Sequence, residues 1–530
     1  MSAPGRSAPE IPAPGAGERR SAARGVAWGG VESAASGLVG LLLTPFVVAR
    51  IGVESLGLWG AAWSLAHTAG LIDMGVGGAY ARFTARAISR GDTEELNGTV
   101  GVGVGAHIAL CALAAGAAAL VGPWALERAA GGSARLAEAR TVLACTLATV
   151  LLRIALSAFR GVVAGAQRLD LLARIGAVAA LLEGAGAAAL LAAGYGLPAM
   201  ALNSLAAAAG ACAAEAALAY RLCPGLRVRP FLARAAHYRA VLSFGIRLQI
   251  TRGAEILGTH VPRLALALGP GLLAAGAYEL GLRAAGATQI LAGLPLRVIL
   301  PLASRLDARG DQARLRSLID GATRYVGVLA VPWAAFVLVD AGTILLAWTG
   351  VPPPPGAAAT ARLMALAILL AGLAAPWRLV LRGIGHPGVE AAATSAGSLL
   401  NLGLALALAG RFAAPGVALA GLAGSSAAVI ILATAARRAG AAGRGPAAAA
   451  IASPLAAGAA ALLAGCALAL PALASASPTA ARGAAVTLLA EHGAVMGAVF
   501  ALAALMTGAL RRADVSVLRE ATLPAGGGRP

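Results

Sequence analysis

Long apolar segments separated by short polar connections run through almost the whole chain. A helix needs about 20 mostly apolar residues to cross a lipid bilayer. About fourteen segments satisfy that requirement, and they lie near residues 26–49, 55–79, 98–122, 139–159, 171–194, 197–219, 241–267, 274–302, 321–346, 361–382, 389–410, 415–436, 448–470 and 484–510. The pattern therefore predicts an all-α polytopic membrane protein with about fourteen transmembrane helices.

Composition and charge agree with a membrane protein. Hydrophobic residues make up 59% of the chain and its mean hydropathy is +0.80, well above the values of soluble domains. The net charge of +19 would suggest nucleic-acid binding in a soluble protein. Here the arginines gather in alternate loops, above all in residues 221–239 and 305–316, which is typical of the cytoplasmic side of a membrane. We therefore expect a multi-pass protein of the plasma (inner) membrane with both termini in the cytoplasm and no nucleic-acid partner.

Two landmarks recur along the chain. The segment "ARIGVESLGLWG" from residue 49 is echoed by "LALGPGLLAAGAYELG" from residue 266, which pairs Gly52 with Gly269, and Arg-Gly-Asp occurs at 90–92 and again at 309–311. An offset of six spans indicates parallel repeats related by an axis along the membrane normal. The predicted organisation is a disordered cytoplasmic tail (1–25), a six-helix lobe (26–220), a basic linker (221–240), a second six-helix lobe (241–436), two additional helices (448–510) and a cytoplasmic tail (511–530).

A polar stripe interrupts the seventh apolar segment. Arg252, Glu255, Thr259 and Arg263 follow one another at helical spacing, so their side chains share one face of the helix. Charged groups inside a membrane usually face a cavity or a transport path, but a structural ion pair between Arg252 and Glu255 is an open alternative. Arg247 falls on the opposite face, nearer the cytoplasm, where its guanidinium can reach the membrane surface.

The eighth segment adds Glu279 and Arg283 one helical turn apart, which is compatible with a second structural ion pair or with a cavity lining. Arg263 has no acid one turn away, and a guanidinium binds phosphate in a bidentate manner. The sequence therefore singles out Arg263 as the first candidate to contact a phosphate, with Arg252, Arg283 and Arg247 beside it.

The first half of the chain carries acids at comparable positions, Glu32 in the first segment and Asp73 in the second. Together with Glu255 and Glu279 they are candidates to line the cavity, to pair with its arginines or to carry a coupling proton. Asp73 lies near the cytoplasmic end and is equally placed to pair with Arg82 or Arg86.

Enzyme chemistry finds no support in the sequence. It contains no phosphate-binding loop of the nucleotide hydrolases, no HExxH zinc motif and no nucleophile elbow between a strand and a helix. The five cysteines have no metal-ligand spacing. We expect neither a metal nor a cofactor, and transport driven by a gradient or by a partner.

Two blocks resemble a known family. "TPFVVARIGVESLGLWG" through "GLIDMGVGGAYARFTARAISRGDTEELN" (44–97) and "ALGPGLLAAGAYELGLRAAGATQILAGLPLRVILPLASRL" (267–306) are similar to the oligosaccharide flippases of the MOP (multidrug/oligosaccharidyl-lipid/polysaccharide) exporter superfamily. That superfamily also contains the MATE drug exporters and the lipid II flippases. The resemblance covers roughly the first 320 residues, and the remainder matches only in hydropathy.

The resemblance implies two six-helix lobes around a cavity that opens to each side of the membrane in turn. The implied cargo is a lipid-pyrophosphate-linked oligosaccharide for cell-surface polysaccharide synthesis, with membrane lipids and the polysaccharide polymerase machinery as partners. A phosphate crossing about 30 Å of hydrocarbon requires a cationic cavity, which the intramembrane arginines would supply. A lipid II flippase is the nearest alternative. A MATE-type drug or cation antiporter would need an acidic, aromatic-rich cavity, and aromatic residues make up only 4% of this chain.

Overall fold

The computed structural model describes residues 16–68, 71, 76–130, 133–230, 235–293, 296, 299–438, 446–473, 481–507 and 509. Regular structure in these ranges is entirely helical. The helices are α1 (Ala16–Thr68), α2 (Val76–Arg90), α3 (Thr93–Ala130), α4 (Ser133–Ala155), α5 (Ser157–Gly165), α6 (Leu169–Ala192), α7 (Leu197–Leu222), α8 (Ala235–Leu268), α9 (Leu272–Gly293), α10 (Ile299–Ala308), α11 (Gln312–Thr349), α12 (Ala357–Gly383), α13 (Pro387–Arg438), α14 (Pro446–Leu473) and α15 (Ala481–Met506). Within this part of the chain, 8 helices are long and apolar enough to cross a membrane, or 9 if the bent pair α4–α5 is one span.

Among the described residues, every predicted membrane segment falls on helices, so the predicted all-α membrane fold is confirmed. α1 holds the predicted segment 26–49 and the first part of 55–79, and it is broken at Gly52 (φ 82°). α13 holds the predicted segments 389–410 and 415–436, and it is broken at Ala413 (φ 48°). Conversely, three predicted segments are divided between two helices: 55–79 between α1 and α2, 139–159 between α4 and α5, and 274–302 between α9 and α10. The gaps between predicted segments at 50–54 and 411–414 therefore coincide with the breaks in α1 and α13, whereas the divisions of 55–79, 139–159 and 274–302 were not predicted.

The two halves of the chain repeat one another at a constant offset. α3 and α11 both contain 38 residues and begin 219 positions apart, at Thr93 and Gln312. The Arg-Gly-Asp turns that precede them match in detail, because Gly91 and Gly310 both have φ 66°. Asp92 Oδ1 accepts from the backbone N–H of Glu95 at 2.8 Å and Asp311 Oδ1 from that of Arg314 at 3.0 Å, so each aspartate caps a helix.

The predicted partner of Gly52 needs a correction. The same offset pairs Gly52 with Gly271, whose φ is 104°, and not with Gly269. Gly271 occupies the turn between α8 and α9, just as Gly52 occupies the break in α1. Both positions require a left-handed backbone, which glycine adopts without steric cost.

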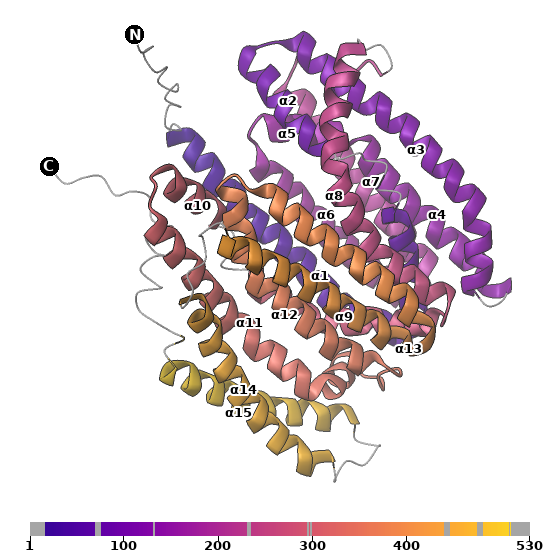
Figure 1. Cartoon of the computed structure of the whole chain (residues 1–530). Coiled ribbons are helices and arrows are strands. Elements are labelled where there is room, and N and C mark those ends of the chain that lie inside the picture. The colour runs from indigo at the N-terminus through magenta and orange to yellow at the C-terminus, as the bar shows by residue number, and fades with distance from the viewer. Residues whose placement is uncertain are drawn as a thin grey trace, which may run out of the picture.

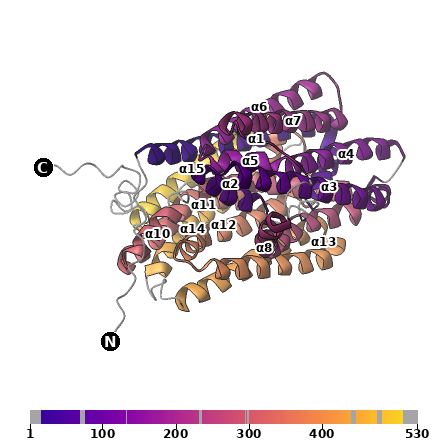
Figure 2. The same cartoon turned by 90° about the horizontal axis from the view of Figure 1, so that it is seen from above.

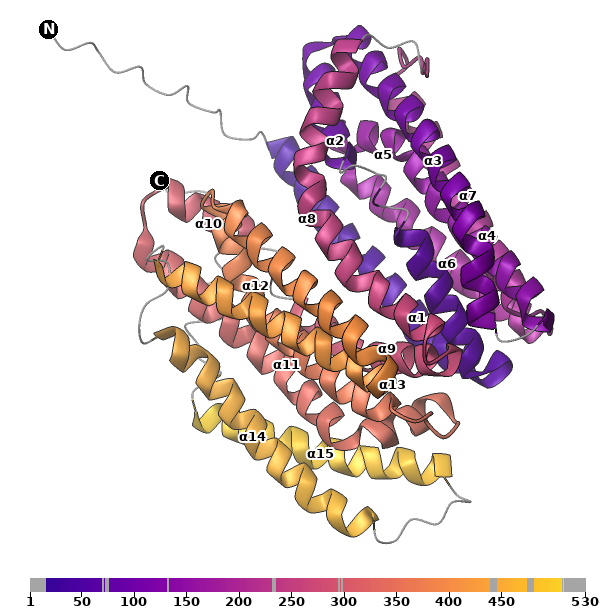
Figure 3. The ribbon, with the colours of Figure 1, turned by 45° about the vertical axis from the view of Figure 1, so that its right-hand side comes forward.

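The helices form two lobes, α1–α7 and α8–α13, with α1 and α8 lying between them (Figure 3). α6 and α7 lie at one edge of the molecule and α13 at the opposite edge (Figure 2). The two Arg-Gly-Asp turns, between α2 and α3 and between α10 and α11, lie at the same end of the bundle, and the ribbons of the lobes diverge toward that end (Figures 1 and 3). The lobes meet mainly through α1 against α9, and through α8 against α1, α2 and α3.

The contact between α1 and α9 is built on glycine. A Cβ added to Gly57 would overlap the carbonyl oxygen of Leu272 and lie 2.7 Å from the backbone N of Gly276. A Cβ added to Gly276 would overlap the carbonyl oxygen of Val53 in turn. Because Gly57 and Gly276, like Val53 and Leu272, are 219 positions apart, this contact is reciprocal about the pseudo-symmetry axis. Small residues let helix backbones approach in this way inside membranes.

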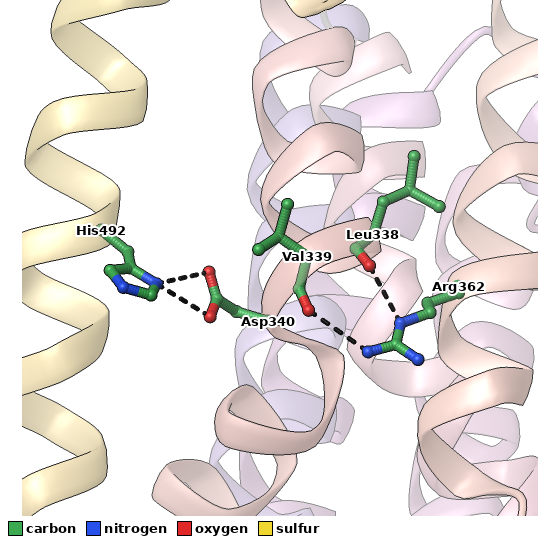
Figure 4. Close-up of polar contacts among 5 residues, drawn as sticks. All are labelled: Leu338, Val339, Asp340, Arg362 and His492. Atoms are coloured by element: carbon green, nitrogen blue, oxygen red, sulfur yellow. Dashed lines mark hydrogen bonds and ion pairs between the residues drawn. The ribbon is translucent and has the colours of Figure 1, made fainter. Parts of the chain in front are cut away.

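The last two helices pack on the outer side of the second lobe, against α11 (Figure 3). His492 of α15 lies with its Nδ1 atom 3.0 and 3.2 Å from the carboxylate oxygens of Asp340, and both side chains are buried. α11 is kinked at Asp340, and Arg362 of α12 donates to the carbonyl oxygens of Leu338 and Val339 at 2.9 and 3.3 Å (Figure 4). The kink is thus stabilised on both sides by polar contacts from neighbouring helices.

Candidate substrate-binding site

Three of the predicted charged residues meet where α8 turns into α9. Glu279 is buried, with 7% of its side chain exposed, and its two carboxylate oxygens lie 3.4 Å from Arg263 Nε and 3.7 Å from Arg283 Nε. Arg283 also donates to the hydroxyl of Thr44 on α1 at 2.7 Å. We call Arg263, Glu279, Arg283 and Thr44 the interlobe cluster, because it joins α8 and α9 of the second lobe to α1 of the first.

The interlobe cluster corrects one expectation about Arg263. The sequence shows no acid one turn from Arg263, but the fold supplies Glu279 from the next helix. The pair between Glu279 and Arg283 follows the predicted spacing of one turn. Two guanidinium groups therefore share one carboxylate, which leaves one positive charge in excess within the cluster.

The geometry of the interlobe cluster leaves polar atoms without full hydrogen bonding. Arg263 Nε and Glu279 Oε1 are buried and have no hydrogen-bond partner among the residues that the structure describes. Their separation of 3.4 Å is an ion-pair contact without hydrogen-bond geometry. A ligand oxygen near Arg263 would therefore compete with a poorly aligned contact.

The other three residues of the polar stripe on α8 lie apart from the interlobe cluster. Arg252, Glu255 and Thr259 are exposed, and Glu255 interacts electrostatically with Arg382 of α12. The side chain of Arg247, in the first part of α8, and the whole of Asp73 lie outside the described residues.

Glu32 occupies a separate position within the first lobe. A Cβ added to Gly176 on α6 would overlap the carboxylate of Glu32, so the side chain packs directly on that helix. Glu32 and Arg160 line a cavity of about 400 Å³ bounded by α1, α2, α5 and α6. Arg160 is paired with Glu215 at 2.6 Å. The structure therefore separates Glu32 from the interlobe cluster.

Comparisons with known proteins agree with this architecture. Residues 106–350 match the family model of a polysaccharide biosynthesis protein. The lipid II flippase MurJ in an inward closed conformation has 13% sequence identity and a TM-score of 0.64, with 88% of this chain and 98% of that chain covered. An inward-facing MATE family transporter of the MOP superfamily has 15% identity and a TM-score of 0.60, with 78% and 94% covered. An outward-facing MATE family transporter has 13% identity and a TM-score of 0.52, with 80% and 96% covered.

The chain has the fold of the MurJ and MATE transporters. It is an integral membrane protein whose two lobes are arranged as in these transporters. A search of curated protein sequences found no match.

A row of aromatic and histidine rings that the sequence analysis missed connects the lobes. Trp59, Trp63 and His67 follow one another along α1 with ring centroids 5.7 and 5.2 Å apart. His67 stacks on His260 of α8 at 5.0 Å, with 12° between the ring planes. The spacing of four residues between the α1 rings is the signal that indicates a shared helix face.

Two cationic side chains lie near the end of this row. Arg153 of α4 and Arg263 of α8 both interact electrostatically with His67. Arg153 is exposed and, within the described ranges, forms no ion pair. Sequence reasoning passed over Arg153, although an arginine inside an apolar segment is itself a functional signal.

Proposed function

We propose that this protein is a flippase that moves a lipid-pyrophosphate-linked oligosaccharide from the cytoplasmic to the outer leaflet by alternating access. One observation carries the proposal: in the interlobe cluster, Arg263 and Arg283 share the single carboxylate of Glu279. A buried charge without full compensation is costly. A phosphate is a ligand that offsets the cost, and guanidinium groups bind phosphate with charge-assisted hydrogen bonds.

The pseudo-symmetric fold supports a rocking mechanism. The lobes meet through the glycine contact of α1 and α9 and diverge toward the end that carries the two Arg-Gly-Asp turns (Figure 3). The arginine distribution is typical of a cytoplasmic side and supports this orientation, with both termini and the entry side of the cargo in the cytoplasm. The protein then acts in the plasma membrane as a transporter rather than an enzyme, with membrane lipids and a polysaccharide polymerase as partners.

Lipid II is the second candidate cargo, because the MurJ structure covers 88% of the chain. Both cargoes present a pyrophosphate, so the excess positive charge of the interlobe cluster favours neither. The match of residues 106–350 to a polysaccharide biosynthesis family favours the oligosaccharide. A MATE-type cation antiporter is disfavoured, since the same excess charge repels a cation.

The proposal is tested in proteoliposomes containing the full chain and a fluorescent lipid-pyrophosphate-linked oligosaccharide, with dithionite quenching as the measure of translocation. Losing a charge-assisted hydrogen bond costs about 1.5–3 kcal/mol, so Arg263→Gln should lower translocation by about tenfold or more. Arg263→Lys should retain part of it, because an ammonium lacks the bidentate geometry.

Arg174→Gln is the matched control. Arg174 is exposed on α6 and stacks over Trp28 at 4.5 Å, away from the interlobe cluster, so its removal should leave translocation unchanged. Normal translocation by an Arg263→Gln/Arg283→Gln double variant at normal protein levels would refute the proposal.

A further inference from the structure

The second lobe contains a cavity that the interlobe cluster does not use. It lies between α12 and the two halves of α13 and has a volume of about 160 Å³. On this measure about 10–15 Å³ is enough for one water molecule, so the cavity has room for one phosphate or one sugar ring. The polar side chains that line it are Arg378, Thr394, Ser398, Asn401 and Ser425.

Arg378 is the only charged residue in this lining. It is half-buried, and it forms no hydrogen bond or ion pair with any residue in the described ranges. Arg382, one turn further along α12, is by contrast held by both carboxylate oxygens of Glu390 at 2.8 and 2.5 Å. Within the described residues no carboxylate binds Arg378, so the cavity presents a guanidinium that favours an anionic ligand.

The hydroxyl groups around Arg378 are also available to form hydrogen bonds with a ligand. Serine and threonine in apolar helices normally donate to a carbonyl one turn back, as Ser426 does to Leu422 at 2.8 Å. Thr394, Ser398 and Ser425 make no such bond with the part of the chain that the structure describes. Sugar hydroxyls both donate and accept, so these side chains are suited to contact a sugar ring.

Asn401 completes the lining from the first half of α13. Its Nδ2 atom donates to the carbonyl oxygen of Gly258 on α8 at 2.8 Å, which fixes the amide. Its Oδ1 atom is buried and finds no hydrogen-bond donor in the described residues. Glycine at 424 keeps the adjacent space open, because a Cβ there would lie 2.9 Å from the Cβ of Asn401. A buried acceptor without a donor destabilises the protein, and a small shift toward a ligand hydroxyl would remove that cost.

We propose that this cavity is a second binding site for the cargo, which takes a phosphate-bearing sugar unit with its anionic group on Arg378 and its hydroxyls against Thr394, Ser398 and Ser425. The proposal rests on the proposed function for the origin of the ligand. The site lies within one lobe, so it retains its shape while the lobes move relative to one another. The cargo would thus be held at two places, at the interlobe cluster and in the second lobe.

The test measures binding rather than transport. The purified full chain is titrated with glucose 1-phosphate, glucose and inorganic phosphate, and the shift of its unfolding temperature is recorded. Glucose 1-phosphate should bind at least tenfold more tightly than glucose, and Arg378→Gln should lose that preference. Ser398→Ala should reduce the preference for glucose 1-phosphate over inorganic phosphate.

Arg382→Gln is the matched control, because it removes a guanidinium from the same helix without changing the cavity lining. It should bind glucose 1-phosphate as the wild type does. If Arg378→Gln does not fold, Ser425→Val fills the cavity and should abolish binding while Arg378 is kept. The proposal would be overturned if Arg378→Gln and Ser425→Val bound glucose 1-phosphate with the affinity of the wild type. It would also be overturned if the wild type did not bind glucose 1-phosphate.

A phospholipid headgroup is a second source of phosphate for Arg378. If it is the true ligand, the wild type in nanodiscs should retain phosphatidylglycerol that glucose 1-phosphate cannot displace, and that result would also overturn the proposal. If the wild-type protein binds glucose 1-phosphate but does not translocate the oligosaccharide, only the proposed function is refuted. If the Arg378→Gln variant translocates the oligosaccharide and binds glucose 1-phosphate as the wild type does, only the second site is refuted.

Discussion

Replacing Gly57 by alanine adds one methyl group at a close backbone contact between the two lobes. The new Cβ would overlap the carbonyl oxygen of Leu272 and lie 2.7 Å from the backbone N of Gly276, and neither backbone atom can rotate away as a side chain would. The clash exists only while α1 and α9 are in contact. Gly57→Ala should therefore destabilise the conformation seen here relative to one in which the lobes separate at this end.

The expected size of the effect follows from the packing. Overfilling a packed interior costs about 1–3 kcal/mol, and each 1.4 kcal/mol changes a two-state population ratio by about tenfold. The ratio of the two conformations should therefore shift by about 5- to 150-fold. Gly276→Ala should do the same, because its Cβ would overlap the carbonyl oxygen of Val53 and lie 2.6 Å from a methyl carbon of that residue.

Double electron–electron resonance between spin labels at Ser89 and Gln312 measures this shift. Both positions are exposed next to the Arg-Gly-Asp turns, at the end where the lobes diverge, and the five native cysteines are replaced beforehand. Gly57→Ala should shorten the distance, since separation at one end brings the other ends together. Gly40→Ala is the control on the same helix, because no heavy atom lies within 4 Å of its added Cβ. A wild-type distance distribution for both Gly57→Ala and Gly276→Ala would refute the reasoning.

Two other outcomes are expected. Breaking the buried pair of Asp340 and His492 by His492→Ala should cost about 3–5 kcal/mol of stability and lower the unfolding temperature, whereas the double change Asp340→Leu/His492→Leu should recover most of it; strictly additive losses would show that the two residues act independently. A cysteine placed in residues 351–355 should react with an impermeant maleimide added outside the cell, and one placed between Arg305 and Arg316 should not; the reverse pattern would contradict cytoplasmic termini.

The helices of this fold were predictable because each must be apolar over its own length, independently of its neighbours. The break at Gly52 is also visible in the sequence, since glycine adopts a positive φ without cost. The kink at Asp340 was not predicted, because it depends on Arg362 of another helix binding the carbonyl oxygens of Leu338 and Val339. Contacts within a helix can be predicted from spacing, but contacts between helices depend on how the helices pack.

In the candidate site, too, contacts within one helix could be predicted from the sequence and contacts between helices could not. The pair of Glu279 and Arg283 follows from their spacing of one turn, whereas the partner of Arg263 comes from a different helix. Arg378 and Arg382 look equivalent in the sequence, one turn apart on one helix. Only the fold distinguishes them, by bringing Glu390 to Arg382 and leaving Arg378 at the cavity.

The repeat also connects the contact between α1 and α9 with the charge of Glu279. The offset of 219 that relates α3 to α11 pairs Gly60 of α1 with Glu279 of α9, and a Cβ added to Gly60 would lie 2.7 Å from Glu279 Cγ. One repeat thus has no side chain where the other has a carboxylate, so the glycine makes room for the acid at the contact between the lobes. In the proposed transport cycle, a phosphate that binds Arg263 and Arg283 leaves Glu279 without its partners against α1. An unpaired buried carboxylate is strongly destabilising, and separation of α1 from α9 would hydrate it. Cargo binding would then favour opening at the end where the lobes are now closed.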